Sequence, residues 1–324
     1  MRGVMWLNWG LLCFVVLASI GLASCKSREP SRSSIVDQSR NRVIEYSIWA
    51  PSCGRPAPLV LISHGAGGHY SDHTWLVNPL LKAGFIVAAL NHPHDTRRDS
   101  SRAGLVRVWD RPADVSFLLL HLIRDAEWSK CIDARRVAVA GFSSGGYTAI
   151  ALAGAIFDPA LMDSYCEREN RRPDCELGRG VLVDRTNATL NFRDDRIKAV
   201  VAMAPAVGPG VTEESLNGIN IPVLVIAAAD DELVSPDSGA RRYANLIRGS
   251  ELIVLPAGGH FVFLECGPVT ALVDLFVDYN LCGRGIDVDR TQVQRRVSDA
   301  TIKFLVQALS ASGKATSQVA PPAA

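Results

Sequence analysis

A serine between two glycines is the clearest reactive group in the sequence. Ser143 lies in the run Gly-Phe-Ser-Ser-Gly over residues 141–145, which has the form G-x-S-x-G. The apolar run 136–140 before it predicts a buried strand, and the small residues after it predict a helix. A sharp strand-to-helix turn of this kind exposes a serine hydroxyl, and the glycines let the two elements approach closely. The pattern therefore predicts Ser143 as the nucleophile of an acyl transfer.

A histidine and two aspartates follow Ser143 at suitable places for a base and an acid. Asp230 and Asp231 come directly after one apolar run, and His260 follows the next one. The chain order Ser-Asp-His at strand ends predicts that His260 takes the proton of Ser143 while an aspartate orients the imidazole. The distance to the next helix favours Asp231 as the acid, with Asp230 as the alternative.

Acyl transfer also needs hydrogen-bond donors for the oxyanion. The backbone N–H of Ser144, at the start of the predicted helix, supplies one. The run His-Gly-Ala-Gly-Gly at 64–68 follows another predicted strand, and we expect the Ala66 N–H to be the second donor, with His64 supporting the loop. A plain glycine turn is the alternative for this run. It lacks the spacing G-x-G-x-x-G, and no cofactor is expected.

A second cluster suggests a different chemistry. His92, His94 and Asp95 look like a metal-ligand run, but the spacing does not match H-x-H-x-D, and the Ser-Asp-His set explains more of the sequence. We therefore expect no metal and interpret these residues as part of a loop or pocket wall. Arg111 and Asp114 are expected to pair locally at a helix start, with a role in supporting the site as the alternative.

The elements that must position these residues alternate along the chain. Short apolar runs predict strands at 43–49, 59–63, 85–90, 136–140, 197–203, 223–227 and 251–255. Helices are expected at about 72–83, 110–125, 147–155, 237–247, 268–279 and 289–310. This alternation predicts an α/β protein with a mostly parallel sheet covered by helices on both faces.

Together these pieces resemble the α/β-hydrolase fold over about residues 42–310. The runs at 64–68, 111–115, 141–147 and 259–261 are similar to those of bacterial predicted dienelactone hydrolases, a group related to platelet-activating-factor acetylhydrolases. The resemblance implies an eight-stranded sheet and a serine esterase. Lipase-like, phospholipase A2-like or lactone-hydrolysing activity is the alternative.

Two departures from those relatives matter. Dienelactone hydrolases use a cysteine nucleophile where this chain has Ser143, which weakens the lactone assignment. The acetylhydrolases place their acid after the sixth strand, where this chain has Ala204 and Pro205. The acid after the seventh strand is therefore expected to act here.

The N-terminus predicts export. Residues 1–24 have a single basic residue, no acidic residue and a long apolar stretch, as in a secretory signal. The following Leu-Ala-Ser-Cys resembles a bacterial lipobox, so Cys25 is expected to carry lipid. An ordinary cleaved signal or an uncleaved anchor is the alternative. Lys26 favours the outer membrane, facing the periplasm or the cell surface.

The remaining chain divides into a tether, one domain and a tail. We expect a flexible tether at 25–41, a hydrolase domain at 42–310 and a disordered tail at 311–324. The insertion 157–195 is expected to be a cap over the site or a surface loop. With 34 basic and 33 acidic residues, the chain lacks the basic excess of a nucleic-acid-binding protein and mildly favours neutral or zwitterionic esters.

Six cysteines remain after the signal and the lipid site. In an oxidising compartment they predict three disulfides, with buried thiols as the alternative. In the resembled fold the third and fifth strands are neighbours, which implies a disulfide between the segments that precede them. The other two disulfides are expected within the insertion and within the segment after His260. The expected pairs are Cys53–Cys131, Cys166–Cys175 and Cys266–Cys282.

Two classes of function follow from the sequence. The first is an esterase that acts on a small-molecule or lipid ester at the membrane, to which the N-terminal lipid attaches it. The second is a surface lipoprotein that keeps the fold only for binding. An elbow serine, a base, an acid and an oxyanion loop in one chain favour the enzyme, because a binding protein has no need of all four.

Overall fold

The computed structural model describes residues 30–51, 53–169, 172–275, 280–283 and 288–315. A single sheet forms its centre, with the strand order β1-β2-β4-β3-β5-β6-β7-β8. The strands are β1 (Ser31–Asp37), β2 (Arg42–Trp49), β3 (Ala57–Ser63), β4 (Ile86–Leu90), β5 (Ile132–Phe142), β6 (Ile197–Met203), β7 (Val223–Ala228) and β8 (Glu251–Leu255). β1 and β2 pair antiparallel, β2 pairs antiparallel with β4, and the pairs from β4 through β8 are parallel.

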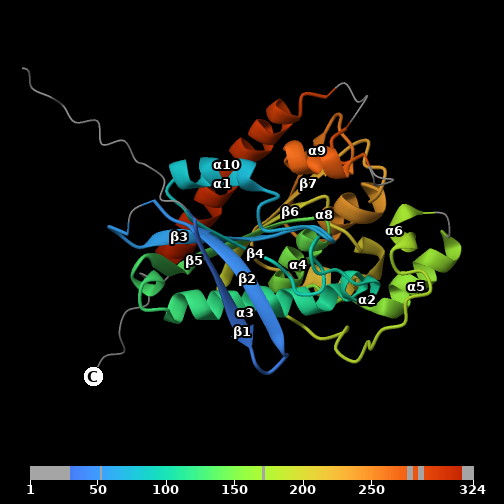
Figure 1. Ribbon diagram of the computed structural model, residues 1–324, viewed down its shortest axis with the longest axis horizontal. Coiled ribbons are helices and arrows are strands. Elements are labelled where there is room, and N and C mark those ends of the chain that lie inside the picture. Colours follow the sequence, from blue (N-terminus) through green and yellow to red (C-terminus); the bar gives the residue numbers. More distant parts are fainter. Residues whose placement is uncertain (1–29, 52, 170–171, 276–279, 284–287, 316–324) are drawn as a thin grey trace, which may run out of the picture.

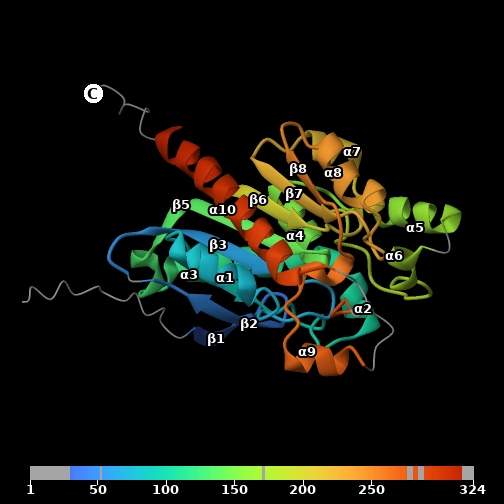
Figure 2. The same cartoon turned by 90° about the horizontal axis from the view of Figure 1, so that it is seen from above.

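Helices cover both faces of this sheet. They are α1 (Thr74–Lys82), α2 (Arg102–Val106), α3 (Arg111–Arg124), α4 (Ser144–Ala153), α5 (Pro159–Arg168), α6 (Pro173–Glu176), α7 (Glu213–Asn217), α8 (Arg242–Leu246), α9 (Pro268–Val273) and α10 (Arg290–Ala315). Figure 1 shows α1 and α10 on one side of the strands and α3 on the other, and Figure 2 shows α10 lying across the sheet. The predicted α/β-hydrolase architecture is therefore confirmed.

Two apolar cores hold the three layers together. One packs α3, α4 and α8 against the sheet, and the other packs α1 and α10 against its opposite face. The central strands are buried on both faces, so their side chains form near-continuous apolar runs, as parallel strands require. This is why the sequence located β6 with its observed boundaries; β8, an edge strand with one buried residue, was also located at its observed boundaries.

The N-terminal boundary of the domain differs from the prediction. The tether expected at 25–41 contains β1, whose seven residues pair with β2 from Arg42 to Ile48. Ile35 packs against the core, while most other β1 side chains are exposed because the strand lies at the edge of the sheet. A polar edge strand has the composition of a linker, and for that reason composition missed it. In the described part of the chain, the sheet begins at Ser31.

Other element boundaries in the structure also differ from the predicted ones. The last helix extends to Ala315, five residues into the expected tail, and residues 316–324 lie outside the described residues. The helix expected at 237–247 is a π-helical turn followed by α8. The helix expected at 268–279 is α9, which ends at Val273, and residues 276–279 lie outside the described residues. The irregular loop 91–108 contains one short helix, α2, which the Ser101 hydroxyl caps.

The structure contains the three expected disulfides. Cys53 pairs with Cys131, Cys166 with Cys175 and Cys266 with Cys282. The first joins the segments that lead into β3 and β5, which are neighbours in the sheet. The second joins α5 to α6 inside the insertion.

The expected signal at 1–24 and the lipid site Cys25 lie outside the described residues. Within the described ranges, no helix combines the length and the apolar character needed to cross a bilayer.

Candidate active site

Ser143 lies on a sharp turn between β5 and α4. Its backbone has φ 55° and ψ −118°, a conformation that a non-glycine residue rarely adopts. A Cβ on Gly141 would overlap the carbonyl oxygen of Gly145, and a Cβ on Gly145 would overlap that of Ser63. The two glycines of the motif are thus required by close backbone contact. The turn presents the Ser143 hydroxyl at the carboxyl end of the central strand, beside the N-terminus of α4.

The three side chains predicted to act together form one hydrogen-bonded chain. The His260 Nε2 atom lies 3.0 Å from the Ser143 Oγ, and its Nδ1 atom lies 2.8 Å from an Asp231 carboxylate oxygen. Because a carboxylate only accepts, Nδ1 carries the proton and Nε2 accepts from the serine hydroxyl. All three side chains are buried. This arrangement can move a proton from the serine to the imidazole.

The geometry distinguishes between the two adjacent aspartates. Asp231 is buried, and its second oxygen accepts from the backbone N–H groups of Leu233 and Val234. Asp230 is exposed to solvent. The backbone N–H of His260 donates to the carboxylate of Glu232, 3.0 Å away. Sequence reasoning missed Glu232, whose only signal is that it directly follows the preferred acid.

The loop 64–68 lies against the serine turn. A Cβ on Gly65 would sit 3.5 Å from the Cβ of Ser143 and 3.0 Å from the ring of Phe142, so only glycine fits at this position without displacing the ring. Ala66 is exposed, and Ser144 is the first residue of α4, where backbone N–H groups have no partner within the helix. Both expected oxyanion donors therefore belong to segments that border the Ser143 hydroxyl.

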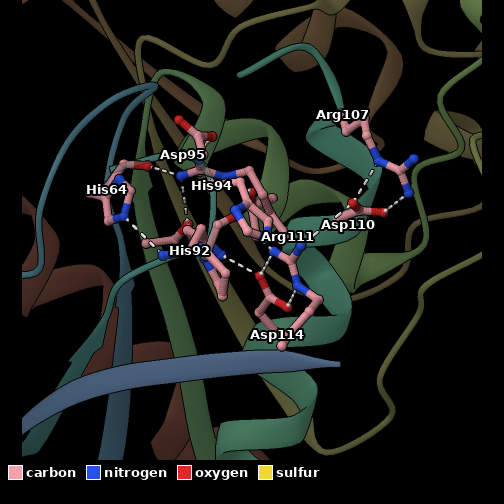
Figure 3. Close-up of polar contacts among 12 residues, drawn as sticks. His64, His92, His94, Asp95, Arg107, Asp110, Arg111 and Asp114 are labelled. Atoms are coloured by element: carbon pink, nitrogen blue, oxygen red, sulfur yellow. Dashed lines mark hydrogen bonds and ion pairs between the residues drawn. The ribbon is translucent and has the colours of Figure 1, made fainter. Parts of the chain in front are cut away.

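The expected pairing of Arg111 with Asp114 is wrong. The side chain of Arg111 forms its ion pair with Asp95 and donates to the carbonyl oxygen of His64, as Figure 3 shows. Asp114, three residues later in α3, pairs instead with the β1–β2 hairpin and with His92. Asp95, one of the residues in the metal-like run, also accepts from the backbone N–H of Gly67 at 2.7 Å.

Asp114 is the centre of a second buried cluster. It accepts two hydrogen bonds from Arg42 at 2.7 Å each and one from Arg40 at 2.8 Å. His92 donates to it from Nδ1 at 3.0 Å, and the other nitrogen of His92 accepts from the Ser63 hydroxyl. Burial opposes ionisation of Asp114, but the bonds from His92 and Arg42 outweigh it and hold the pKa of Asp114 below its ordinary value. The β1–β2 hairpin is thereby joined through Asp114 to His92, whose backbone contacts His64 in the loop 64–68.

The buried histidines near the site are neutral. Burial lowers the pKa of His73 to about 4 and that of His92 to about 3, and it lowers the pKa of His64 well below its ordinary value. His64 donates from Nδ1 to the Gly65 carbonyl at 2.6 Å and accepts from the His92 backbone N–H at 3.2 Å. This agrees with the expected role of His64 in supporting the loop. In the described part of the chain, no three His, Cys, Asp or Glu side chains are grouped to hold a metal.

The insertion 157–195 contains α5 and α6, and Phe157 at its start pairs with Val211 in the segment before α7. Burial raises the pKa of the Asp174 carboxyl, and the negative charge of Asp231 contributes to the same shift. Asp174 is next to Cys175, whose disulfide to Cys166 fixes α6 on α5. The role of the insertion as a cap or as a surface loop stays a prediction.

The sheet order, the parallel strands and the serine on a strand-to-helix turn define the α/β-hydrolase class. Residues 59–274 match the profile of the alpha/beta hydrolase family, and the chain belongs to this family. No curated protein matches the sequence.

Two solved structures are similar to this chain. One is a ferulic acid esterase from Streptomyces cinnamoneus, with a TM-score of 0.59, 19% identity and coverage of 87% of this chain and 89% of that one. The other is a puromycin-hydrolyzing peptidase from Mycobacterium tuberculosis, with a TM-score of 0.56 and 16% identity. The second match covers 90% of this chain but 41% of the peptidase. At these identities the likeness shows a shared fold. It does not identify the dienelactone hydrolase or acetylhydrolase groups suggested by the sequence motifs.

Proposed function

We propose that this protein is a serine esterase that hydrolyses carboxylic esters through Ser143, His260 and Asp231. The observation that carries the proposal is the hydrogen-bonded chain from the Ser143 hydroxyl through the His260 ring to Asp231, on a strained turn of a hydrolase fold. A protein that only binds a ligand gains nothing from holding a non-glycine residue in this backbone conformation, because such strain costs on the order of 1–3 kcal/mol.

Each residue has a defined step in the proposed reaction. The Ser143 Oγ attacks the ester carbonyl while its proton passes to the Nε2 of His260, and Asp231 stabilises the resulting imidazolium. The carbonyl oxygen becomes an oxyanion that accepts from the N–H groups of Ala66 and Ser144. His260 then protonates the leaving alcohol, and the acyl group remains on Ser143. A water molecule, deprotonated by His260, attacks this acyl-enzyme, and the acid and the free serine are released.

The proposed setting is the outer membrane of a bacterial envelope, with the chain anchored by lipid on Cys25 and facing the periplasm or the surface. Three disulfides support export, because disulfides persist in oxidising compartments. The substrate class is a small or lipid carboxylic ester. A platelet-activating-factor acetylhydrolase-like or lactone-hydrolysing activity is the finer alternative within the same mechanism.

The test compares hydrolysis of p-nitrophenyl acetate and butyrate by the wild-type protein and by Ser143→Ala. We expect loss of about 10⁴-fold or more in kcat for Ser143→Ala with the fold retained in circular dichroism. Equal rates in the two proteins would refute the esterase assignment. An acyl-chain series from acetate to palmitate, followed by phospholipid and lactone substrates, then separates the short-chain esterase from the alternatives.

A further inference from the structure

We propose that Arg111 and Asp95 are positioning residues that clamp the loop 64–68 onto α4 and so set the directions of the two oxyanion N–H groups. This inference rests on the proposed function, because it assigns these residues a purpose in stabilising the oxyanion. Neither side chain touches the substrate in the proposed mechanism.

The clamp holds the loop on both sides of its exposed residue. Arg111 donates to the carbonyl oxygen of His64, and Asp95 accepts from the N–H of Gly67 at 2.7 Å. The peptide between Gly65 and Ala66, which carries the proposed donor, lies between these two fixed points. The ion pair between Arg111 and Asp95 joins the two fixed points to each other. The carbonyl of that peptide accepts from the Gly68 N–H at 3.1 Å and from the His64 ring, and the clamp fixes the peptides on either side of it.

The same arginine reaches the other wall of the oxyanion site. The Nε of Arg111 lies 3.3 Å from the hydroxyl of Thr148 on α4. That hydroxyl donates to the carbonyl oxygen of Ser144 at 2.8 Å, one turn earlier in the helix. One guanidinium thus connects the loop that carries the Ala66 N–H with the helix turn that carries the Ser144 N–H. A planar fork with five donors can make these contacts at the same time.

The position of the pair also favours a role beyond stability. Arg111 and Asp95 are each 1% exposed. Burial lowers the pKa of Arg111 and raises that of Asp95, and in each case the partner's charge opposes the shift. Burying two charges costs free energy, and apolar residues of similar volume often give equal or greater stability. A costly ion pair directly beneath the loop is explained if the loop geometry depends on it.

Hydrogen bonds of the His64 side chain also support the loop. The His64 ring is held between the Gly65 carbonyl and the backbone N–H of His92. Figure 3 shows His64 beside His92 and Arg111. These bonds fix the start of the loop. On its other side the Gly68 N–H donates to the Gly65 carbonyl and the Gly68 carbonyl accepts from the Arg97 N–H, while Asp95 supplies a side-chain contact to Gly67. Loss of the clamp should therefore loosen the loop without removing it.

The test uses Arg111→Lys, which keeps the charge but loses the fork, and Asp95→Asn, which keeps the size but loses the charge. The control is Asp194→Asn, which removes the charge from a partly exposed ion pair with Arg196 elsewhere in the protein. For each variant we would measure kcat per fluorophosphonate-titrated site, KM, and the affinity of a trifluoromethyl ketone, whose adduct places an oxyanion in the same site. Ser143→Ala is assayed in parallel.

Losing one oxyanion donor costs about 10²–10³ in kcat, so a displaced donor should cost about 10–100-fold per titrated site, with KM within about threefold. The ketone affinity should fall by the same factor as kcat/KM, while Asp194→Asn changes neither. Unchanged kcat per site in both clamp variants would overturn the clamp, and an active Ser143→Ala would instead overturn the proposed function. If Arg111→Lys and Asp95→Asn both fail to fold, Thr148→Val provides the test. Its kcat per titrated site should fall by about threefold or more, and a wild-type value would reject the clamp.

Discussion

Strain and hydrogen bonding at single residues explain why the chain places a serine where it does. Ser143 keeps a backbone conformation that favours glycine, and Gly141 and Gly145 have no space for a side chain. This conformation holds the Oγ of Ser143 3.0 Å from the Nε2 of His260. The motif spacing and the chain order were sufficient to predict Ser143, Asp231 and His260. Glu232 and Arg42 were beyond sequence reasoning, because their roles depend on contacts between segments that spacing cannot place.

The choice between the adjacent aspartates gives a prediction at this scale. Asp231→Asn should lower kcat by about 10⁴-fold, because an amide no longer holds the imidazole in the tautomer that accepts the serine proton. Asp230→Asn should leave kcat within about twofold, since its side chain is exposed and outside the chain of hydrogen bonds. Steady-state kinetics of the two variants check this. A large loss in Asp230→Asn with an active Asp231→Asn would reverse the assignment.

Buried histidines predict sensitivity to acid. In the unfolded chain a histidine has a pKa of about 6.5, whereas burial lowers the pKa of His73 to about 4 and that of His92 to about 3. Below pH 6.5 the unfolded chain binds protons that the folded chain does not. Stability should therefore fall as the pH decreases from 6.5 towards 4, by up to about 1.4 kcal/mol per pH unit for each histidine.

Urea unfolding at pH 7.5 and pH 5.0 measures this slope. His73→Phe should have a shallower slope than the wild type, because one depressed pKa is removed, whatever its stability at pH 7.5. His94→Gln serves as the comparison, since the replaced side chain is 59% exposed rather than buried. Identical slopes in His73→Phe and the wild type would show that His73 is not held neutral by burial.

At the scale of elements, cross-links and edge strands determine how firmly the site is supported. The segment after His260 is fixed to the N-terminal part of α1, because His73 and Trp75 both donate to the Phe263 carbonyl. The hairpin of β1 and β2 supplies Arg40 and Arg42 to the cluster around Asp114. Apolar periodicity predicted the central strands well, because their side chains are buried on both faces. It failed for β1, which is exposed, and for α2, which has no buried residue.

The disulfides should stabilise the fold unequally. Cys53 and Cys131 are 78 residues apart, and Cys166 and Cys175 are 9 apart. Because a longer closed loop removes more entropy from the unfolded chain, replacing the first pair by serines should cost about 4–5 kcal/mol and replacing the second about 2–3 kcal/mol. Urea unfolding of the two double variants tests the order. A larger loss from the shorter loop would show that native contacts, rather than chain entropy, dominate.

At the scale of the whole molecule, family membership and export are separate questions. The fold was predictable because alternating strands and helices admit few arrangements, and right-handed crossovers restrict them further. The described domain places its site at the carboxyl ends of parallel strands, where open α/β sheets bind their ligands. The proposed attachment to a membrane rests on the N-terminal segment, about which the folded domain carries no information.

The lipid anchor is therefore tested independently of activity. Cys25→Ser should move the protein from the membrane fraction to the soluble fraction and abolish labelling by a palmitate analogue. Its rate on soluble p-nitrophenyl esters should match that of the wild type, because Cys25 precedes the folded domain. Fractionation with activity assays of each fraction makes the comparison. A protein that stays in the membrane without label would indicate an uncleaved anchor helix.

The most direct test of the central claim is to map the residue that becomes covalently modified. The native protein is treated with a fluorophosphonate, and the adduct is located by peptide mass spectrometry while residual esterase activity is measured. We expect one adduct per chain, on Ser143, with activity lost in proportion to labelling and no labelling of Ser143→Ala. An adduct on another residue, or full activity after complete modification of Ser143, would contradict the account.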